Sequence, residues 1–198
     1  MLRCRNLRRV RDEQGSALLE FAITLPLLVV FVVGIYDFSG AFNQKQKIAQ
    51  AAQEGAIITG AQPRNDIEQS NLDPDSLRPV VTSVFNSLAA ASLLPNANVG
   101  GCKPPGTVLR QAALQWKYTI SACSAISTDD LVITINRATA CVSGANCAAG
   151  PPVAVGSVVS VQYPYHWRFN SVIQLLIPGA SYAAITQLTE SATVQNQM

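Results

Sequence analysis

The longest apolar run of the chain lies near its N-terminus. From Leu18 to Phe38 the sequence reads LLEFAITLPLLVVFVVGIYDF, which is apolar through Tyr36 apart from three residues, Glu20, Thr24 and Pro26. At 1.5 Å per residue, about 20 such residues span a hydrocarbon layer of roughly 30 Å. A buried core helix would show polar residues along one stripe, which this run lacks. The pattern therefore predicts a transmembrane segment over residues 16–38, in which neighbouring helices or local readjustment compensate for the proline.

Downstream of this run, apolar and polar positions alternate at helical spacing. The apolar positions include Phe42, Ile48, Ala49, Ala52 and Ala56, and Gln, Lys and Glu fill most of the others. We expect one long helix from about Ser16 to Thr59, with Gly60 as its stop. Residues 39–60 are then an amphipathic continuation of the membrane helix, and residues 61–198 form an exported domain.

A second helix is predicted from Asp73 to about Ala91. Asp73 is expected to cap its N-terminus and Pro74 to take its first helical position. Its core face is expected to consist of Leu77, Val80, Val81, Val84, Phe85 and Leu88. A loop rich in Pro, Gly and Asn follows, from Leu94 to Thr107.

The second half of the chain carries strand-like alternation. The segments are Gln115–Ala122, Asp130–Asn136, Val153–Tyr163, with a break in phase at Gly156 and Ser157, and the tail Tyr182–Val194, for which we favour a strand over a helix. Antiparallel strands packed on an N-terminal helix make an α+β domain. The expected fold is a long N-terminal helix, a second helix and a sheet of about three to four strands, as in pilins.

Charge is scarce and unevenly placed. Charged residues are 13% of the chain, against 48% hydrophobic residues, whereas ordinary soluble domains carry about 25% charged residues. Basic residues cluster before Gly15, as Arg3, Arg5, Arg8, Arg9 and Arg11. Residues 1–15 therefore form a basic leader, which keeps the N-terminus in the cytoplasm and directs the remainder outward. The rest of the chain is close to neutral, which argues against a nucleic-acid partner.

A secretory signal peptide is the alternative interpretation of this N-terminus. Ser39-Gly40-Ala41 loosely resembles a small-residue cleavage site. The apolar run is longer than a typical signal core, however, and helix-forming sequence continues beyond that site. We therefore expect the segment to be retained.

The junction between leader and apolar run holds the most specific local feature. Gly15 ends the leader, Ser16 follows, and Glu20 stands at the edge of the apolar helix. A carboxylate near a bilayer is costly and implies a partner. Cleavage after Gly15, where a peptidase can approach the backbone closely, would create an α-amine for Glu20 to neutralise on a neighbouring subunit. The alternative is a first-turn acid in the wet headgroup region that favours the helix dipole.

Residues 15–56, GSALLEFAITLPLLVVFVVGIYDFSGAFNQKQKIAQAAQEGA, resemble the N-terminal segment of the TadE-like family. Members of that family are minor pilins or pseudopilins of the Tad (Flp, type IVc) pilus system. The resemblance implies cleavage by a prepilin peptidase after Gly15, with Glu20 as the glutamate at the fifth position of the mature chain. It also implies that other pilins or pseudopilins and the inner-membrane pilus assembly machinery are partners. Asp37 departs from the family pattern, in which many relatives carry Glu.

The resemblance also implies a location. The chain would be a single-pass protein of the inner (cytoplasmic) membrane with its C-terminal domain in the periplasm or outside the cell. Whether it also enters the pilus is left open. Its size favours a minor rather than a major subunit.

The cysteines fall into two groups. Cys4 lies in the leader, and the four others lie far downstream, at Cys102, Cys123, Cys141 and Cys147. Four cysteines allow three pairings. The short spacing of Cys141 and Cys147 favours one local bridge, which leaves Cys102 for Cys123. Zinc is disfavoured, because the chain has no Cys-x-x-Cys pair and one histidine.

Little in the sequence favours catalysis. His166 is the only histidine, within the aromatic segment Tyr163-Pro164-Tyr165-His166-Trp167, and is more typical of a turn anchor than of a ligand site. Phosphate-loop, HExxH and GxSxG motifs are missing. We expect no enzyme activity, cofactor or metal. Two other hypotheses stay open: an uncleaved single-span protein with an exported binding domain, and a secreted enzyme dependent on His166.

Overall fold

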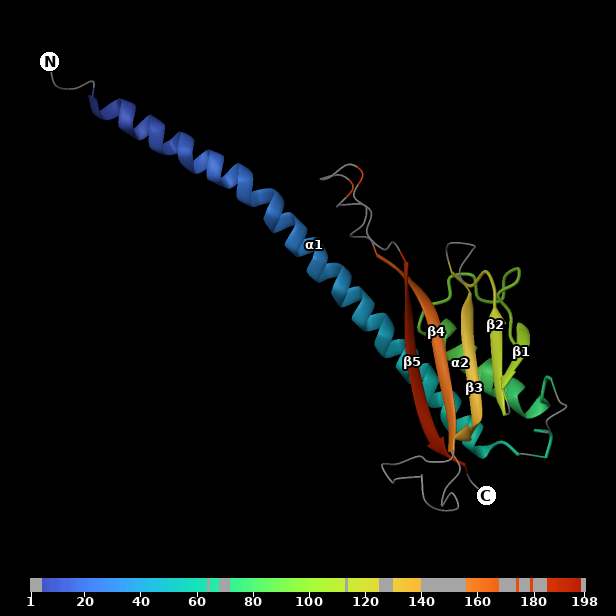
Figure 1. Ribbon diagram of the computed structural model, residues 1–198. Coiled ribbons are helices and arrows are strands. Elements are labelled where there is room, and N and C mark those ends of the chain that lie inside the picture. Colours follow the sequence, from blue (N-terminus) through green and yellow to red (C-terminus); the bar gives the residue numbers. More distant parts are fainter. Residues whose placement is uncertain are drawn as a thin grey trace. The chain divides into compact units, whose positions relative to one another are not determined.

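The computed structural model describes residues 5–63, 65–67, 72–112, 114–124, 130–139, 156–167, 174, 179 and 185–196. Figure 1 shows the elements in chain order. They are α1 (Arg5–Ala61), the 3₁₀ turn η1 (Asp75–Leu77), α2 (Arg78–Ala90), β1 (Thr107–Ala112), β2 (Gln115–Ile120), β3 (Leu131–Thr139), β4 (Gly156–His166) and β5 (Ile185–Gln195). A long apolar helix, a short helix and an antiparallel sheet confirm the predicted α+β class.

The chain forms two compact units. One contains Met1–Gly40 and Trp167–Ala184, and the other contains Ala41–His166 and Ile185–Met198. Helix α1 contributes its first part to one unit and its last turns to the other. Each unit is described on its own below.

In the second unit, the sheet is an antiparallel meander in the order β1-β2-β3-β4-β5. One row of paired residues crosses all five strands and consists of Val108, Tyr118, Ile133, Val161 and Glu190. Because side chains alternate across a strand, this row marks the face that packs on the helices. The opposite face carries Lys117, Thr134 and Ser160 in the next row.

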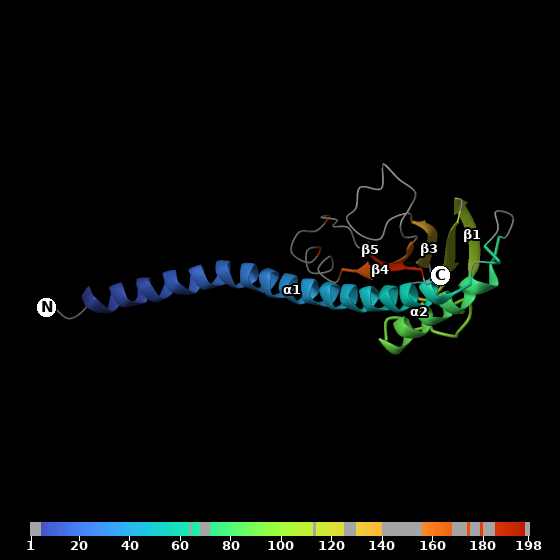
Figure 2. The ribbon, with the colours of Figure 1, turned by 90° about the horizontal axis from the view of Figure 1, so that it is seen from below.

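The core lies between this face and two helices. The last turns of α1 and the whole of α2 cover the same side of the sheet (Figure 2). Buried residues of α1 include Ile48, Ala51, Ala52 and Ala56. The predicted core face of the second helix is correct in full, since Leu77 and the five residues listed with it are all completely buried.

Helix α1 is longer than predicted at both ends. It begins at Arg5 rather than near Ser16, and Gly60 lies within it rather than stopping it. Gly60 is placed where a Cβ would lie 3.0 Å from Cγ1 of Val194 on β5, so close contact with the sheet explains the glycine. The helix ends at Ala61, two residues before Pro63, which cannot continue it.

The start of the second helix was also predicted wrongly. Pro74 is extended, with ψ at 130°, and the chain first makes the 3₁₀ turn at Asp75. Helix α2 follows from Arg78, with a proline, Pro79, in its first turn. Asp73 is therefore not an N-cap. Its carboxylate instead accepts hydrogen bonds from Arg78, at 2.7 Å, and from the Tyr118 hydroxyl, at 3.3 Å.

The sheet has one strand more than the upper limit predicted. Strand β1 falls just after the predicted loop and was missed, because its residues are half-exposed or exposed at a sheet edge. Strands β2, β3 and β5 lie within or close to predicted segments, whereas β4 begins at Gly156 and continues to His166. The aromatic segment before Trp167 is thus part of a strand and not a turn. Val153 and Val155 lie outside the described residues.

Candidate functional site

The membrane-spanning prediction falls on the first part of α1, in the first compact unit. Among the described residues, one helix is long and apolar enough to cross a bilayer, and its most apolar stretch has no residue buried in the protein. Exposed side chains include Leu18, Phe21, Ile23, Leu27, Leu28, Phe31 and Ile35, each more than 60% exposed. Such a surface is unstable in water and is stable in lipid or against other apolar helices. The length and composition of this helix, the one such helix in the described residues, indicate a single-pass membrane protein.

Gly15 and Ser16 lie inside α1, in helical and exposed positions. A Cβ added at Gly15 would meet no heavy atom within 4 Å. Packing therefore does not require glycine here, and glycine in a helix interior costs about 1 kcal/mol relative to alanine. The described part of the chain gives no packing reason for this glycine.

Glu20 is exposed on α1, one turn beyond Ser16. Within the described residues it makes no hydrogen bond and no ion pair. Its neighbours on both sides are exposed apolar residues, Leu19 and Phe21, 64% and 62% exposed. The structure thus presents an uncompensated carboxylate on an apolar helix surface, without bringing any described basic group to it.

The last turns of α1 carry a different surface, built from small residues. Ala41, Ala51, Ala52 and Ala56 are buried, and Gly55 lies with them. A Cβ at Gly55 would collide with Val84 of α2 and lie 3.3 Å from Val159 of β4. Small side chains on one stripe allow the helix to approach both neighbours closely. The run from Ala51 to Ala56 (AAQEGA) is therefore where the helix packs on the sheet and on α2.

Two lysines of α1 extend this junction, and sequence reasoning missed both. Lys45 forms an ion pair of 3.0 Å with Glu190 on β5, and Lys47 donates to the carbonyl of Ala91 at 2.9 Å. Ala91 is the C-cap of α2, so Lys47 satisfies a helix-end carbonyl. The Lys45 side chain is 54% exposed, so the pair contributes under about 1 kcal/mol. No local pattern reveals a partner this distant in sequence.

Arg137 ties the end of α1 to the sheet. Its guanidinium donates from Nη1 to the carbonyl of Pro63 at 3.1 Å and from Nη2 to that of Gln62 at 3.0 Å. The residue is only 2% exposed and follows Leu131, Ile133 and Ile135 on the core face of β3. Buried charges require such partners. Alternation along the strand predicts an inward side chain here, but it does not predict the carbonyls that receive it.

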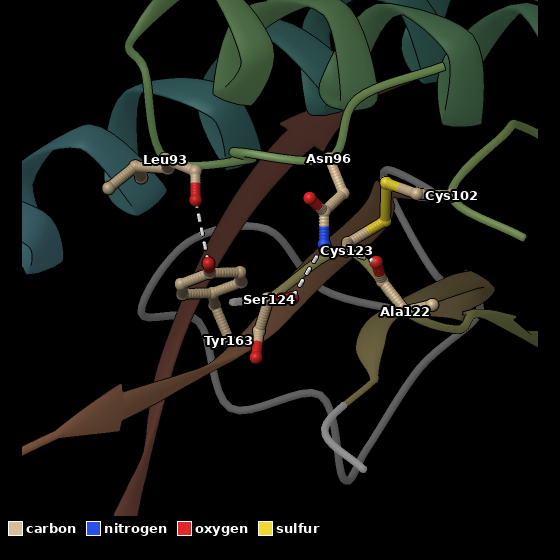
Figure 3. Close-up of a disulfide and its surroundings, with 7 residues drawn as sticks. All are labelled: Leu93, Asn96, Cys102, Ala122, Cys123, Ser124 and Tyr163. Carbon is tan, nitrogen blue, oxygen red and sulfur yellow. Dashed lines mark hydrogen bonds between the residues drawn. A yellow bond between two sulfur atoms is a disulfide. The ribbon is translucent and has the colours of Figure 1, made fainter. Parts of the chain in front are cut away.

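A disulfide and three hydrogen bonds join the segment after α2 to the turn that follows β2 and to β4 (Figure 3). Cys102 and Cys123 form a disulfide. This is the pair that remained in the sequence analysis once Cys141 was assigned to Cys147. Asn96 donates to the carbonyls of Ala122 and Ser124 at 3.2 and 2.9 Å, and the Tyr163 hydroxyl donates to the Leu93 carbonyl at 2.6 Å. Cys141 and Cys147 lie outside the described residues.

No group of three or more His, Cys, Asp or Glu side chains in the described part of the chain is placed to hold a metal ion. His166 is the last residue of β4 and pairs with Ile185. Tyr118 is the group with the clearest electrostatic effect, because burial, and then the charge of Asp73, raise the pKa of its hydroxyl above 10.0.

Comparison with known protein families gives a match in the first part of the chain. The model of one family, described as TadE-like protein, matches residues 15–56. Comparison with curated proteins and with solved structures gives no significant match. The matched range begins at Gly15, includes the exposed apolar surface of α1 and ends at Ala56, within the small-residue junction. Residues 15–56 of this chain are therefore similar to TadE-like proteins, and the match does not extend to the domain that follows α1.

Proposed function

We propose that this protein is a minor pilin or pseudopilin that takes part in assembly of a Tad (Flp, type IVc) pilus. A prepilin peptidase cleaves it after Gly15, and the chain then begins at Ser16. It resides in the inner (cytoplasmic) membrane, with the N-terminus in the cytoplasm and the domain after α1 outside. It acts by assembly with other pilins and the pilus machinery, not by catalysis.

The observation that carries this proposal is the exposed apolar part of α1 together with the uncompensated Glu20. The most apolar stretch of this surface is not buried within the described chain, and it lies within the family match. A helix of this kind is stable in a bilayer and is also suited to the core of a filament of similar helices. The same apolar side chains can therefore contact lipid before assembly and neighbouring helices in the filament after it.

Glu20 sets the register of assembly in this proposal. After cleavage, the new α-amine of Ser16 is a cation at the end of an apolar helix. Pairing it with Glu20 of a neighbouring subunit removes two desolvation penalties together. An unpaired carboxylate in that environment disfavours any register that leaves the charge without a partner.

The decisive test is the N-terminus of the protein purified from its native cells. Mass spectrometry of the intact chain and of its N-terminal peptide should identify Ser16 as the first residue. A Gly15→Leu variant should keep its leader, because the added side chain blocks close approach of the peptidase. A Ser16→Ala variant is the matched control, since it keeps a small residue next to the same bond and should be cleaved normally.

Other N-termini would contradict the proposal in distinct ways. A chain that begins at Phe42 would be the product of signal peptidase acting at Ser39-Gly40-Ala41. A chain that keeps residues 1–15 in piliated cells would support an uncleaved single-span protein with an exported binding domain. In that case Gly15→Leu would leave pilus formation unchanged.

A further inference from the structure

The first compact unit contains an apolar hollow on the surface of α1. Its volume is about 500 Å³, within the range of about 300–1,000 Å³ for small-molecule sites. Helix α1 supplies most of the lining, and Trp167, the residue after β4, supplies the rest. The ring of Trp167 lies 5.5 Å from that of Phe38, at an interplanar angle of 57°. Gly34 opens the hollow, because it contributes no side chain to it.

The hollow lies at the end of the apolar run. From Leu18 to Phe38 a helix rises about 30 Å, the thickness of a hydrocarbon layer. When Leu18 lies at one boundary of the bilayer, Phe38 and Trp167 lie at the other. Tryptophan and tyrosine gather at such boundaries, where an amphipathic ring has one apolar side and one wet side. Tyr36, 68% exposed, occupies the same level of the helix.

The surroundings of the hollow favour a lipid as its occupant. Its lining is continuous with the exposed apolar surface of the span, since Phe31 and Ile35 belong to both and are 64% and 69% exposed. Asp37 is its one charged lining residue; it precedes Phe38 near the end of the span and is itself buried in the protein. The sequence after Trp167 also suits a membrane surface, since Phe169 and the residues from Val172 to Ile177 are apolar apart from Gln174.

We propose that an acyl chain of the leaflet at the Phe38 end occupies this hollow, and that Trp167 is a second membrane anchor of the protein. The first anchor is the span itself. This inference requires α1 to be in a membrane, but it is independent of cleavage after Gly15. Residues 30–38 and Trp167 are present in the cleaved and the uncleaved chain.

Quenching of tryptophan fluorescence by brominated lipid tests this proposal. The protein has two tryptophans, Trp116 and Trp167, and Trp116 is completely buried in the core of the exported domain. The full-length protein is placed in phosphatidylcholine vesicles whose acyl chains carry bromine. Emission of the wild type should fall toward half, because Trp167 contacts the acyl chains and Trp116 does not. Bromine near the headgroup end should quench more than bromine near the chain methyl.

Trp167→Phe is the matched variant, because it leaves Trp116 untouched and keeps an aromatic ring beside Phe38. Its emission should not respond to brominated lipid. Equal responses of the wild type and Trp167→Phe would overturn the inference, as would quenching of Trp167 by aqueous iodide instead of lipid. If a second copy of the chain occupied the hollow, brominated lipid would not quench the emission of Trp167, and the inference would be overturned. Flotation with the vesicles shows separately whether α1 is inserted, so loss of the second anchor is distinguishable from loss of the span.

Discussion

Nη2 of Arg137 on β3 lies 3.0 Å from the carbonyl oxygen of Gln62, the residue after the end of α1. A second bond from the same guanidinium reaches Pro63. Helix ends leave carbonyls without intrahelical partners, and here a buried cation on the sheet satisfies the carbonyls just past the helix. The connection fixes where the long helix ends relative to the strands it covers.

Replacing Arg137 by methionine should therefore destabilise the helix-and-sheet domain by about 1.5–3 kcal/mol, because it removes the hydrogen bonds of a buried cation to two part-buried carbonyls. Urea unfolding followed by circular dichroism measures the loss. Arg110→Met is the matched control. Arg110 lies on edge strand β1, with its guanidinium carbon 6.0 Å from the centre of the Trp116 ring, a contact worth about 0.5–1 kcal/mol. Equal losses for both variants would contradict the role given to Arg137.

Gly55→Ala should destabilise the domain, although alanine is the better helix former by about 1 kcal/mol. The new Cβ collides with Val84 and approaches Val159, and overpacking of this kind costs about 1–3 kcal/mol. We expect a net loss of up to about 2 kcal/mol in urea unfolding.

A second substitution and a second glycine check this steric explanation. Adding Val84→Ala to Gly55→Ala should cost less than the sum of the two single changes, because it makes room for the new methyl. Gly15→Ala should leave the stability of the domain unchanged, since a Cβ there meets open space. If the losses in free energy of unfolding were additive in the double variant, a collision between the new methyl group at position 55 and Val84 would be ruled out.

Glu20→Gln should permit cleavage but reduce pilus assembly. If the pair with the neighbouring α-amine is worth more than about 1.4 kcal/mol, incorporation of the subunit falls about tenfold or more. Quantitative immunoblotting of sheared pili and of membranes measures the fraction of the subunit that is incorporated. Glu54→Gln is the control, because Glu54 is an exposed carboxylate on the same helix, outside the apolar surface. Normal piliation by the Glu20→Gln variant would contradict the proposed pairing of Glu20 with the α-amine of a neighbouring subunit.

Alkaline pH should destabilise the helix-and-sheet domain through Tyr118. Burial and the charge of Asp73 raise its pKa above the ordinary value of 10.0. In the unfolded chain the phenol loses its proton near pH 10, whereas in the folded protein it keeps it to higher pH. The unfolded state then binds fewer protons, so this contribution to stability is complete below pH 10 and declines as the pH rises above it.

Urea unfolding between pH 8 and about pH 11 measures this decline. Tyr118→Phe cannot lose a phenolic proton, so its stability should depend less on pH in the alkaline range, whatever its stability at pH 8. Identical slopes for the two proteins would show that other groups cause the alkaline loss.

Periodicity revealed the elements that have one buried face. The buried face that runs from Leu77 of η1 to Leu88 of α2, and the alternation of Leu131, Ile133 and Ile135 on β3, were predicted because burial imposes a period on the sequence. Strand β1 has no such period. At the sheet edge its Leu109 is 62% exposed, so apolar and polar residues carry little information about its pairing.

The features of the candidate site also fall into two groups, those that a local sequence pattern reveals and those that depend on contacts between distant residues. The apolar run and the Gly15–Glu20 junction were visible in the sequence because each is a local pattern of residue types. The pairs Lys45–Glu190 and Arg137–Gln62 were not, because their members meet only after the sheet has formed. The small-residue stripe around Gly55 was visible as composition, but the reason for it required Val84 and Val159 in place.

The Cys102–Cys123 disulfide closes a separation of 21 residues. Bonds of this kind form where the surroundings are oxidising, and rarely in a cytosol that keeps thiols reduced. A chain that inserted backwards, or never inserted, would keep both sulfurs as free thiols. In the orientation proposed above, the bond therefore distinguishes molecules whose domain has left the cytoplasm from molecules whose domain has stayed there, and alkylation of Cys102 and Cys123 followed by mass spectrometry would detect the difference.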